Sequence, residues 1–229
     1  MKLSNKILIG FFGFIFLYLT AAFAELRLTG SPSVIDETNS IEETVDLPAF
    51  AVLIVGGFTA DVKVIPSDRP RLQIRSFTGD LLKSFNYQLS GDTLTLSGFQ
   101  PEDVPPAKIS LSLFVPETGF RGISVNSSVV IVEGLEQETL LISQNAGRIW
   151  MSDTRINNIQ IEASNGSYLD IAGTHLDTLS ANVEQSQVLI NSSVGLVRGS
   201  ITNGTYLRLN QIREIHLKKD ESSKLTLYQ

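Results

Sequence analysis

The residue types that most often perform catalysis or bind metals are scarce in this sequence. It has no cysteine and two histidines, His175 and His216, which lie far apart in the chain. Neither histidine has a second nitrogen or sulfur ligand at the spacing of a zinc site, and neither is paired with a serine and a carboxylate as in a hydrolase triad. Glycine-rich nucleotide motifs and a Gly-x-Ser-x-Gly motif are missing too. We therefore expect no catalytic residue, no metal site and no cofactor, and we expect both histidines at turns or on the surface.

The elements that would position any functional residue are predicted to be β-strands. After residue 43, apolar and polar residues alternate in short runs such as FAVLI at 50–54, and turn residues such as Gly91-Asp92 separate the runs. This alternation is typical of strands with one buried face. No window after residue 24 has the 3.6-residue period of an amphipathic helix. We predict an all-β fold.

From about residue 120 the strands form a repeat. Each unit has an apolar pair, a turn of small polar residues and a second apolar pair. The units begin at Ile123, Leu140, Ile159, Leu179, Val197 and Ile215. A repeat of about 17–20 residues with two short strands predicts coils stacked so that like residues lie above like. We therefore predict a right-handed parallel β-helix, or β-solenoid, whose apolar pairs point inward.

A leucine-rich repeat is the alternative architecture, because Ile156-x-x-Ile159-x-Ile161 imitates the start of such a unit. That repeat normally has roughly 20–29 residues and a helical return segment. Here the return segments, such as SYLDIAG at 167–173, are again strand-like, which favours the β-helix.

Four Asn-x-Ser/Thr motifs raise the question of glycosylation. They lie at Asn126, Asn165, Asn191 and Asn203. Three of them recur at the turn of a unit, and SNGSYL at 164–169 returns as TNGTYL at 202–207, two units later. Asn and Gly tolerate the left-handed backbone of tight turns, so the motifs are explained by turn chemistry.

Three aromatic residues are the candidate binding site. If Leu169 and Leu207 point inward, alternation sends the preceding Tyr168 and Tyr206 outward, and it does the same for Trp150, the one tryptophan. Exposed aromatic rings are a common platform for sugars and protein partners. The alternative is a register one residue away, which would place the rings in the core.

An enzymatic reading needs carboxylates and a basic residue on the outer face of adjacent coils, as in polysaccharide-cleaving β-helix enzymes. Asp153, Arg155 and Asp170 are the residues that could take that role. A solenoid also needs a polar outer face to stay soluble, so ordinary surface positions are favoured for all three.

The N-terminus predicts export. Lys2 and Lys6 precede an uncharged apolar run at 7–24, which is just long enough to span a bilayer as an anchor. Ala22-Phe23-Ala24 also fits a signal-peptide cleavage site, so residues 1–24 are a signal peptide or a transmembrane anchor. Either way the positive charges keep the N-terminus cytoplasmic and send the rest across the membrane.

The remaining chain divides by composition. Residues 25–43 are polar and acidic and are expected to be a linker. We expect one β-solenoid domain over 44–229, with a β-rich start at 44–116 and regular coils at 117–229. Without the first 24 residues, 16 basic residues face 24 acidic ones, a formal charge of −8, which argues against a nucleic-acid partner.

Two stretches carry a resemblance to a known family: FAVLIVGGFTADVKVIPSDRPRLQIRS at 50–76 and DLLKSFNYQLSGDTLTLSG at 80–98, followed by coils rich in Asn, Gly and Ser. Over about residues 44–217 the chain resembles the exported β-solenoid family called putative auto-transporter adhesin, head GIN domain, of Gram-negative envelopes. It departs from that family at the turn PSDRP, 66–70. The resemblance implies adhesion and supplies no catalytic or binding residues.

Together these observations predict a non-enzymatic, adhesin-like binding or scaffolding module. It would lie on the periplasmic or extracellular face of a Gram-negative envelope, anchored through residues 7–24 if that segment is not cleaved, with a glycan or an envelope protein as partner. A polysaccharide-active enzyme and a self-assembling structural β-helix are the alternatives.

Overall fold

The computed structural model describes residues 11–21, 23, 40–58, 60–77, 79–97, 109–173 and 175–228. The chain divides into two units, Met1–Val34 and Ile35–Gln229. In the first unit, residues 11–21 and 23 are helical, and the other residues of the expected apolar helix lie outside the described ranges. No helix in the described part of the chain combines the length and the hydrophobicity needed to cross a membrane.

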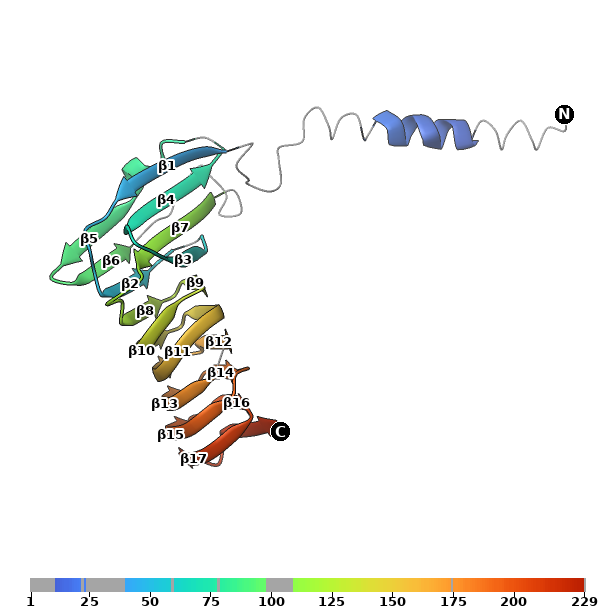
Figure 1. The fold of residues 1–229 in the computed structure, drawn as a ribbon. Helices are drawn as coiled ribbons and strands as arrows, with labels where there is room; N and C mark the ends of the chain where they lie inside the picture. Colours follow the sequence, from blue (N-terminus) through green and yellow to red (C-terminus); the bar gives the residue numbers. More distant parts are fainter. Residues whose placement is uncertain are drawn as a thin grey trace. The chain divides into compact units, whose positions relative to one another are not determined.

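The described residues of the second unit form strands and one short 3₁₀ helix, η1 (Leu81–Ser84) (Figure 1). In chain order the strands are β1 (Ile41–Asp46), β2 (Val52–Gly56), β3 (Val62–Ser67), β4 (Arg71–Ser76), β5 (Asn86–Ser90), β6 (Thr93–Ser97), β7 (Ile109–Pro116), β8 (Gly122–Asn126), β9 (Val129–Glu133), β10 (Glu136–Asn145), β11 (Arg148–Ser164), β12 (Tyr168–Gly173), β13 (Leu176–Glu184), β14 (Gln187–Ile190), β15 (Val194–Thr202), β16 (Tyr206–Asn210), β17 (Ile212–Lys219) and β18 (Lys224–Tyr228). The first strand begins at Ile41, inside the segment expected to be a linker.

The predicted all-β fold and stacked coils are confirmed. From β8 onward, parallel strands form two sheets that wrap one solenoid of about six coils. Sheet A contains β9, the first part of β11, β12, β14, β16 and β18. Sheet B contains β8, β10, the second part of β11, β13, β15 and β17. The return segments are strands, as the β-helix prediction required and a leucine-rich repeat would not have.

The strand register corrects how the first two repeat units were aligned with each other. A single column of sheet B runs through Ile123, Ile142, Ile161, Ala181, Gly199 and Leu217, at nearly constant spacing in the chain. The sequence-based pairing of Ile123 with Leu140 is therefore shifted by two residues. Leu140 and Ile142 are both fully buried, and a period-2 pattern does not distinguish two inward positions on the same strand.

The N-terminal strands do not follow the order of the chain. β2 pairs in parallel with β8 on one side and with β6 on the other, and β3 pairs in the same way with β9 and β7. The coil made by β2 and β3 is thus inserted between later segments. Antiparallel strands lie beyond it: β4 and then β1 on sheet A, and β5 on sheet B. The predicted parallel β-helix is therefore found in the coils, and the β-rich start combines parallel with antiparallel pairs.

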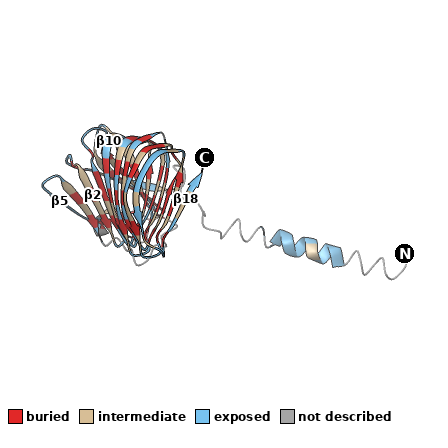
Figure 2. Cartoon of the chain, turned by 90° about the horizontal axis from the view of Figure 1, so that it is seen from below, coloured by how far each residue is buried: buried red, intermediate tan, exposed pale blue. Residues whose placement is uncertain are grey.

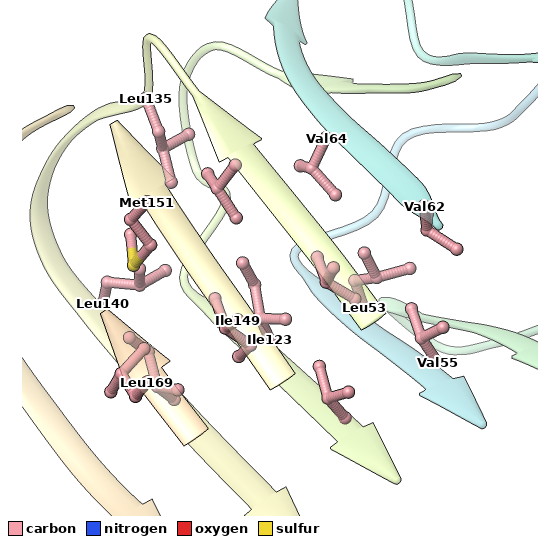
Figure 3. Close-up of a cluster of buried hydrophobic side chains, with 14 of the residues drawn as sticks. Leu53, Val55, Val62, Val64, Ile123, Leu135, Leu140, Ile149, Met151 and Leu169 are labelled. Carbon is pink, nitrogen blue, oxygen red and sulfur yellow. The ribbon is translucent and has the colours of Figure 1, made fainter. Parts of the chain in front are cut away.

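One hydrophobic core runs through the whole second unit. Buried residues alternate with more exposed ones along most of the strands, so that one side of each sheet faces inward (Figure 2). The strands of the last coil, β17 and β18, contain no buried residue. Figure 3 shows side chains of the inserted coil, including Leu53 and Val64, in the same cluster as Ile123, Ile149 and Leu169 of the regular coils. The N-terminal strands and the coils are therefore one packed body.

The corner that leads from sheet B to sheet A has the same backbone in successive coils. It places Ser127, Ala146, Asn165, Gln185 and Asn203 at φ between 48° and 57°. Buried hydroxyls follow the corner and link neighbouring coils: Ser186 Oγ accepts a hydrogen bond from the Ser167 amide at 3.1 Å, and Ser223 Oγ accepts one from the Thr205 amide at 3.2 Å. Both amides also donate within their own corner, to the Ser164 and Thr202 carbonyls, so the serine hydroxyls add a link between neighbouring coils.

The two Asn-Gly motifs mark longer corners. Two residues separate Asn145 from Arg148, whereas three separate Ser164 from Tyr168, the positions paired with them. The extra residue is a glycine with φ 77° at both Gly166 and Gly204. Asn165-Gly166 and Asn203-Gly204 thus form wider corners next to the strands that begin with Tyr168 and Tyr206.

Candidate functional site

The outer face of sheet A carries the aromatic residues expected from the sequence. Tyr168 and Tyr206 are half-buried and are each followed by an inward leucine with no exposed surface, Leu169 or Leu207. Strand register places both tyrosines in one column, which we call the tyrosine column. It reads Arg148, Tyr168, Gln187, Tyr206 and Lys224 along the stack.

Trp150 is also half-buried on this face, but it does not lie in the tyrosine column. It pairs with Asp170 in the neighbouring column, which continues through Leu189 and Arg208. From its outward position the sequence would place Trp150 in line with the tyrosines, but the strand register places it two residues further along its coil than Tyr168 and Tyr206 are along theirs. The rings of Trp150 and Tyr168 still meet across the columns, with centroids 6.0 Å apart and planes inclined at 53°.

The aromatic rings line a hollow of about 580 Å³ at the corner side of sheet A. Its wall joins the outer face of the sheet to the corners of three coils. The residues that line it are Arg148, Trp150, Gly166, Ser167, Tyr168, Gln185, Ser186, Gln187, Gly204 and Tyr206. The small residues of the two wide Asn-Gly corners leave the space in front of both tyrosines open, and the hollow extends along the stack.

A hydrogen-bonded network fixes the floor of this face beside the hollow. The Tyr168 hydroxyl donates to Asp170 Oδ2 at 3.3 Å, and Asn191 Nδ2 donates to Asp170 Oδ1 at 2.7 Å. Arg208 in turn donates to Asn191 Oδ1 at 2.8 Å. Burial raises the pKa of the Tyr168 phenol above its usual value, and the nearby Asp170 carboxylate adds to the increase. Tyr168 therefore stays neutral, with a fixed ring orientation.

The charge of this face differs from that of the whole chain. Among the outward residues of its last five strand segments (148–152, β12, β14, β16 and β18), the cations are Arg148, Arg208 and Lys224 and the one carboxylate is Asp170. The chain as a whole has a formal charge of −6. Lys224 Nζ lies 5.7 Å from the centre of the Tyr206 ring, so a positive charge stands at the edge of the aromatic surface.

The two histidines lie on the surface and do not approach one another in the strand register. His175 Nδ1 lies 2.9 Å from Ser193 Oγ, and His216 Nε2 lies 2.6 Å from Glu214 Oε1. In the described part of the chain, no group of three or more His, Cys, Asp or Glu residues could hold a metal ion.

The three residues considered for polysaccharide cleavage take separate local roles. Asp153 occupies a corner of β11 with φ 53°, and Arg155 forms an exposed ion pair with Glu136 at 3.1 Å. Asp170 belongs to the network with Tyr168 and Asn191. Among the described residues, no hydrogen bond or ion pair joins any two of these three side chains.

The Asn-x-Ser/Thr motifs have two kinds of position. Asn165 and Asn203 occupy the corners described above, and Asn165 Nδ2 donates to Asn145 Oδ1 of the preceding coil at 2.7 Å. Asn191 instead joins Asp170 to Arg208 beside the hollow. Asn126, the last residue of β8, directly precedes the corner residue Ser127. Turn chemistry explains these three corner motifs, and the polar network explains Asn191.

Sequence reasoning did not identify Arg148, Gln187 or Lys224 as partners of the two tyrosines. They occupy the residue immediately before the second apolar pair of their units, as Tyr168 and Tyr206 do. Reading every unit at that one position would have revealed the whole column.

Comparisons with known proteins identify the fold. No family model matches the sequence, and no curated protein matches it. The crystal structure of a putative adhesin from Bacteroides fragilis has 16% identity and a TM-score of 0.57, with 82% of this chain and 96% of that chain covered. A structure named a putative lipid binding protein, from Parabacteroides distasonis, has 14% identity and a TM-score of 0.52, covering 84% of this chain and 94% of that one. At this identity, the likeness shows an adhesin-like fold.

Proposed function

We propose that this protein is an exported, non-enzymatic binding module of the bacterial envelope, which holds an extended ligand in the hollow on sheet A. The observation that carries the proposal is the combination of Trp150, Tyr168 and Tyr206 with amide side chains in one open hollow. Aromatic rings contact the flat faces of a ligand, and Gln185 and Gln187 provide donors and acceptors for hydroxyl groups.

A glycan is the ligand class that this chemistry favours over a protein. The hollow alternates rings with amides along one direction, since Gln187 lies between Tyr168 and Tyr206 in the column. Sugar rings present an apolar face and a rim of hydroxyls, which is the same alternation. A protein partner would be expected to bury a larger continuous surface.

The compartment and the family are part of the same proposal. The apolar run at 7–24, after two lysines, supports export with the N-terminus cytoplasmic, and the fold supports membership in the adhesin-like family that the sequence resembles. We also infer a right-handed coil, because crossovers between parallel strands almost always have that hand. Membrane fractionation with N-terminal sequencing of the mature protein tests the first part.

The binding function is tested with a glycan array. The full chain, purified in mild detergent, is applied to extended neutral and acidic polysaccharides and compared with the Tyr168→Ala/Tyr206→Ala variant. We expect the variant to lose about 10-fold in affinity, since two ring contacts are removed. The matched control is Tyr87→Ala/Tyr228→Ala, which removes two exposed tyrosines outside the hollow. Equal affinity of both variants for every bound glycan would contradict the proposal.

A further inference from the structure

In the tyrosine column a positive charge flanks the two tyrosines on each side. Arg148 precedes Tyr168 and Lys224 follows Tyr206, with Gln187 in the middle. Parallel strands are about 4.8 Å apart, so the two end positions are about 19 Å apart along the stack and the two tyrosines about 10 Å. The latter distance is close to the repeat of two pyranose units in an extended β-linked chain.

Arg148 is an exposed side chain at the rim of the hollow. Lys224 is also exposed and lies beside the Tyr206 ring. Both cations are therefore available to a ligand, whereas the guanidinium of Arg208 is engaged by Asn191. The Asp170 carboxylate, the one acidic group among the outward residues of the same five strand segments, already accepts hydrogen bonds from Tyr168 and Asn191.

Arg148 and Lys224 form a positively charged stripe on an otherwise acidic protein, and such a stripe favours a negatively charged ligand. The chain has a formal charge of −6, so an anionic polymer is repelled by most of the surface and attracted at this stripe. A neutral glycan could accept hydrogen bonds from Arg148 and Lys224 but would gain no attraction between opposite charges. Because the two cations flank the tyrosines, they would extend the contact with a negatively charged polymer beyond the aromatic rings.

We propose that the ligand is an acidic, extended polysaccharide, such as a chain of uronic acids, which lies along the solenoid axis. Its alternate sugar rings contact Tyr168 and Tyr206, its hydroxyls bond to Gln187, and its carboxylates approach Arg148 and Lys224. This inference rests on the proposed glycan-binding function and adds the charge and the direction of the ligand.

The test compares two hexasaccharides that differ in one group per sugar: β-1,4-linked glucuronic acid and β-1,4-linked glucose. Titration calorimetry of the full chain at low salt should show the glucuronic acid hexamer binding about 10-fold more tightly. This preference should shrink as salt is raised, because exposed charges are screened. In Arg148→Gln/Lys224→Gln the acidic hexamer should bind about 10-fold more weakly, because two exposed charge contacts are lost, and the neutral hexamer should change little, so that the preference disappears.

The matched control is Arg213→Gln/Lys218→Gln, which removes the same charge from exposed positions on β17 of sheet B. It should keep the preference for the acidic hexamer. Equal or tighter binding of the neutral hexamer, or a preference that survives loss of Arg148 and Lys224, would overturn the inference and leave the glycan-binding function intact. Failure to bind either hexamer or any glycan on the array would overturn both.

Discussion

Replacing Gly199 with alanine should destabilise the solenoid more than the same change at another left-handed glycine. Gly199 lies in an inward column of sheet B next to Ala181 and has φ 128°. A Cβ atom added there would overlap the Ala181 carbonyl oxygen and lie 2.7 Å from its carbonyl carbon, far inside contact distance. The strand must therefore shift and weaken its ladder at this coil.

The magnitude follows from two separable costs. A non-glycine residue at positive φ costs about 1–2 kcal/mol, and disturbing a buried backbone hydrogen bond costs about 1–3 kcal/mol more. We expect Gly199→Ala to lower the free energy of unfolding by about 3 kcal/mol. Gly204 has φ 77° and no atom within 4 Å of an added Cβ, so Gly204→Ala should cost about 1 kcal/mol.

Urea unfolding of the full chain, followed by circular dichroism, measures both changes as shifts of the midpoint at constant slope. The difference between the two variants isolates the contact with Ala181 from the backbone term. If both variants shift the midpoint equally, the close approach at Gly199 does not contribute and the argument from geometry is wrong.

Three further predictions use single side chains. Leu140→Ala should lower the free energy of unfolding in urea by about 2–5 kcal/mol, because the Leu140 side chain is fully buried. Leu141 is 41% exposed on the outer face, so Leu141→Ala should lower it by less than about 0.5 kcal/mol. Equal losses of stability would contradict the register. Asp170→Asn should lower the pKa of the Tyr168 phenol, followed by ultraviolet titration, because the carboxylate contributes to its increase; an unchanged titration would refute the contact. Hydrogen bonds from Ser223 and the Asn203 amide lower the pKa of Asp220 to about 2 from 3.8, so its stabilisation of the last corner is present above pH 3.8 and is lost as pH falls through about 2. The protection of the Asn203 amide from hydrogen exchange, relative to its intrinsic rate at each pH, should therefore decrease over that range in the wild type, but not in Asp220→Asn.

Much of the fold follows from alternation and turn chemistry alone. Apolar pairs such as Leu169 and Ile171 specify an inward face, and Asn-Gly specifies a corner. Gln144 is an exception to this alternation, because it is a polar residue at an inward position. It occupies the inward position paired with Val125, is 2% exposed, and donates to the Tyr168 carbonyl at 3.1 Å. A buried amide looks like a turn residue in the sequence, which is why alignment by sequence places the first unit two residues out of register.

Alternation also made part of the candidate site predictable from the sequence. Alternation places Trp150 and both tyrosines on the outer face, but the column of each depends on how neighbouring coils are aligned. The hollow depends in addition on the extra corner glycines, Gly166 and Gly204, whose effect appears only when adjacent corners are compared in space. Pairings between β2 and β8, such as Leu53 with Ile123, join distant parts of the chain and have no local signal at all.

The inserted coil of β2 and β3 has a consequence for how the chain reaches its native state. Its two neighbours come from β6–β7 and from β8–β9, so the first coil to be synthesised is not enclosed until residue 132 has been made. These contacts are distant in sequence and should form slowly. Every later coil adds to a finished neighbour, one coil at a time. We therefore expect formation of the inserted coil and its neighbours β6–β9 to be the slow step of folding, and the coils beyond it to add to that template in the order of synthesis.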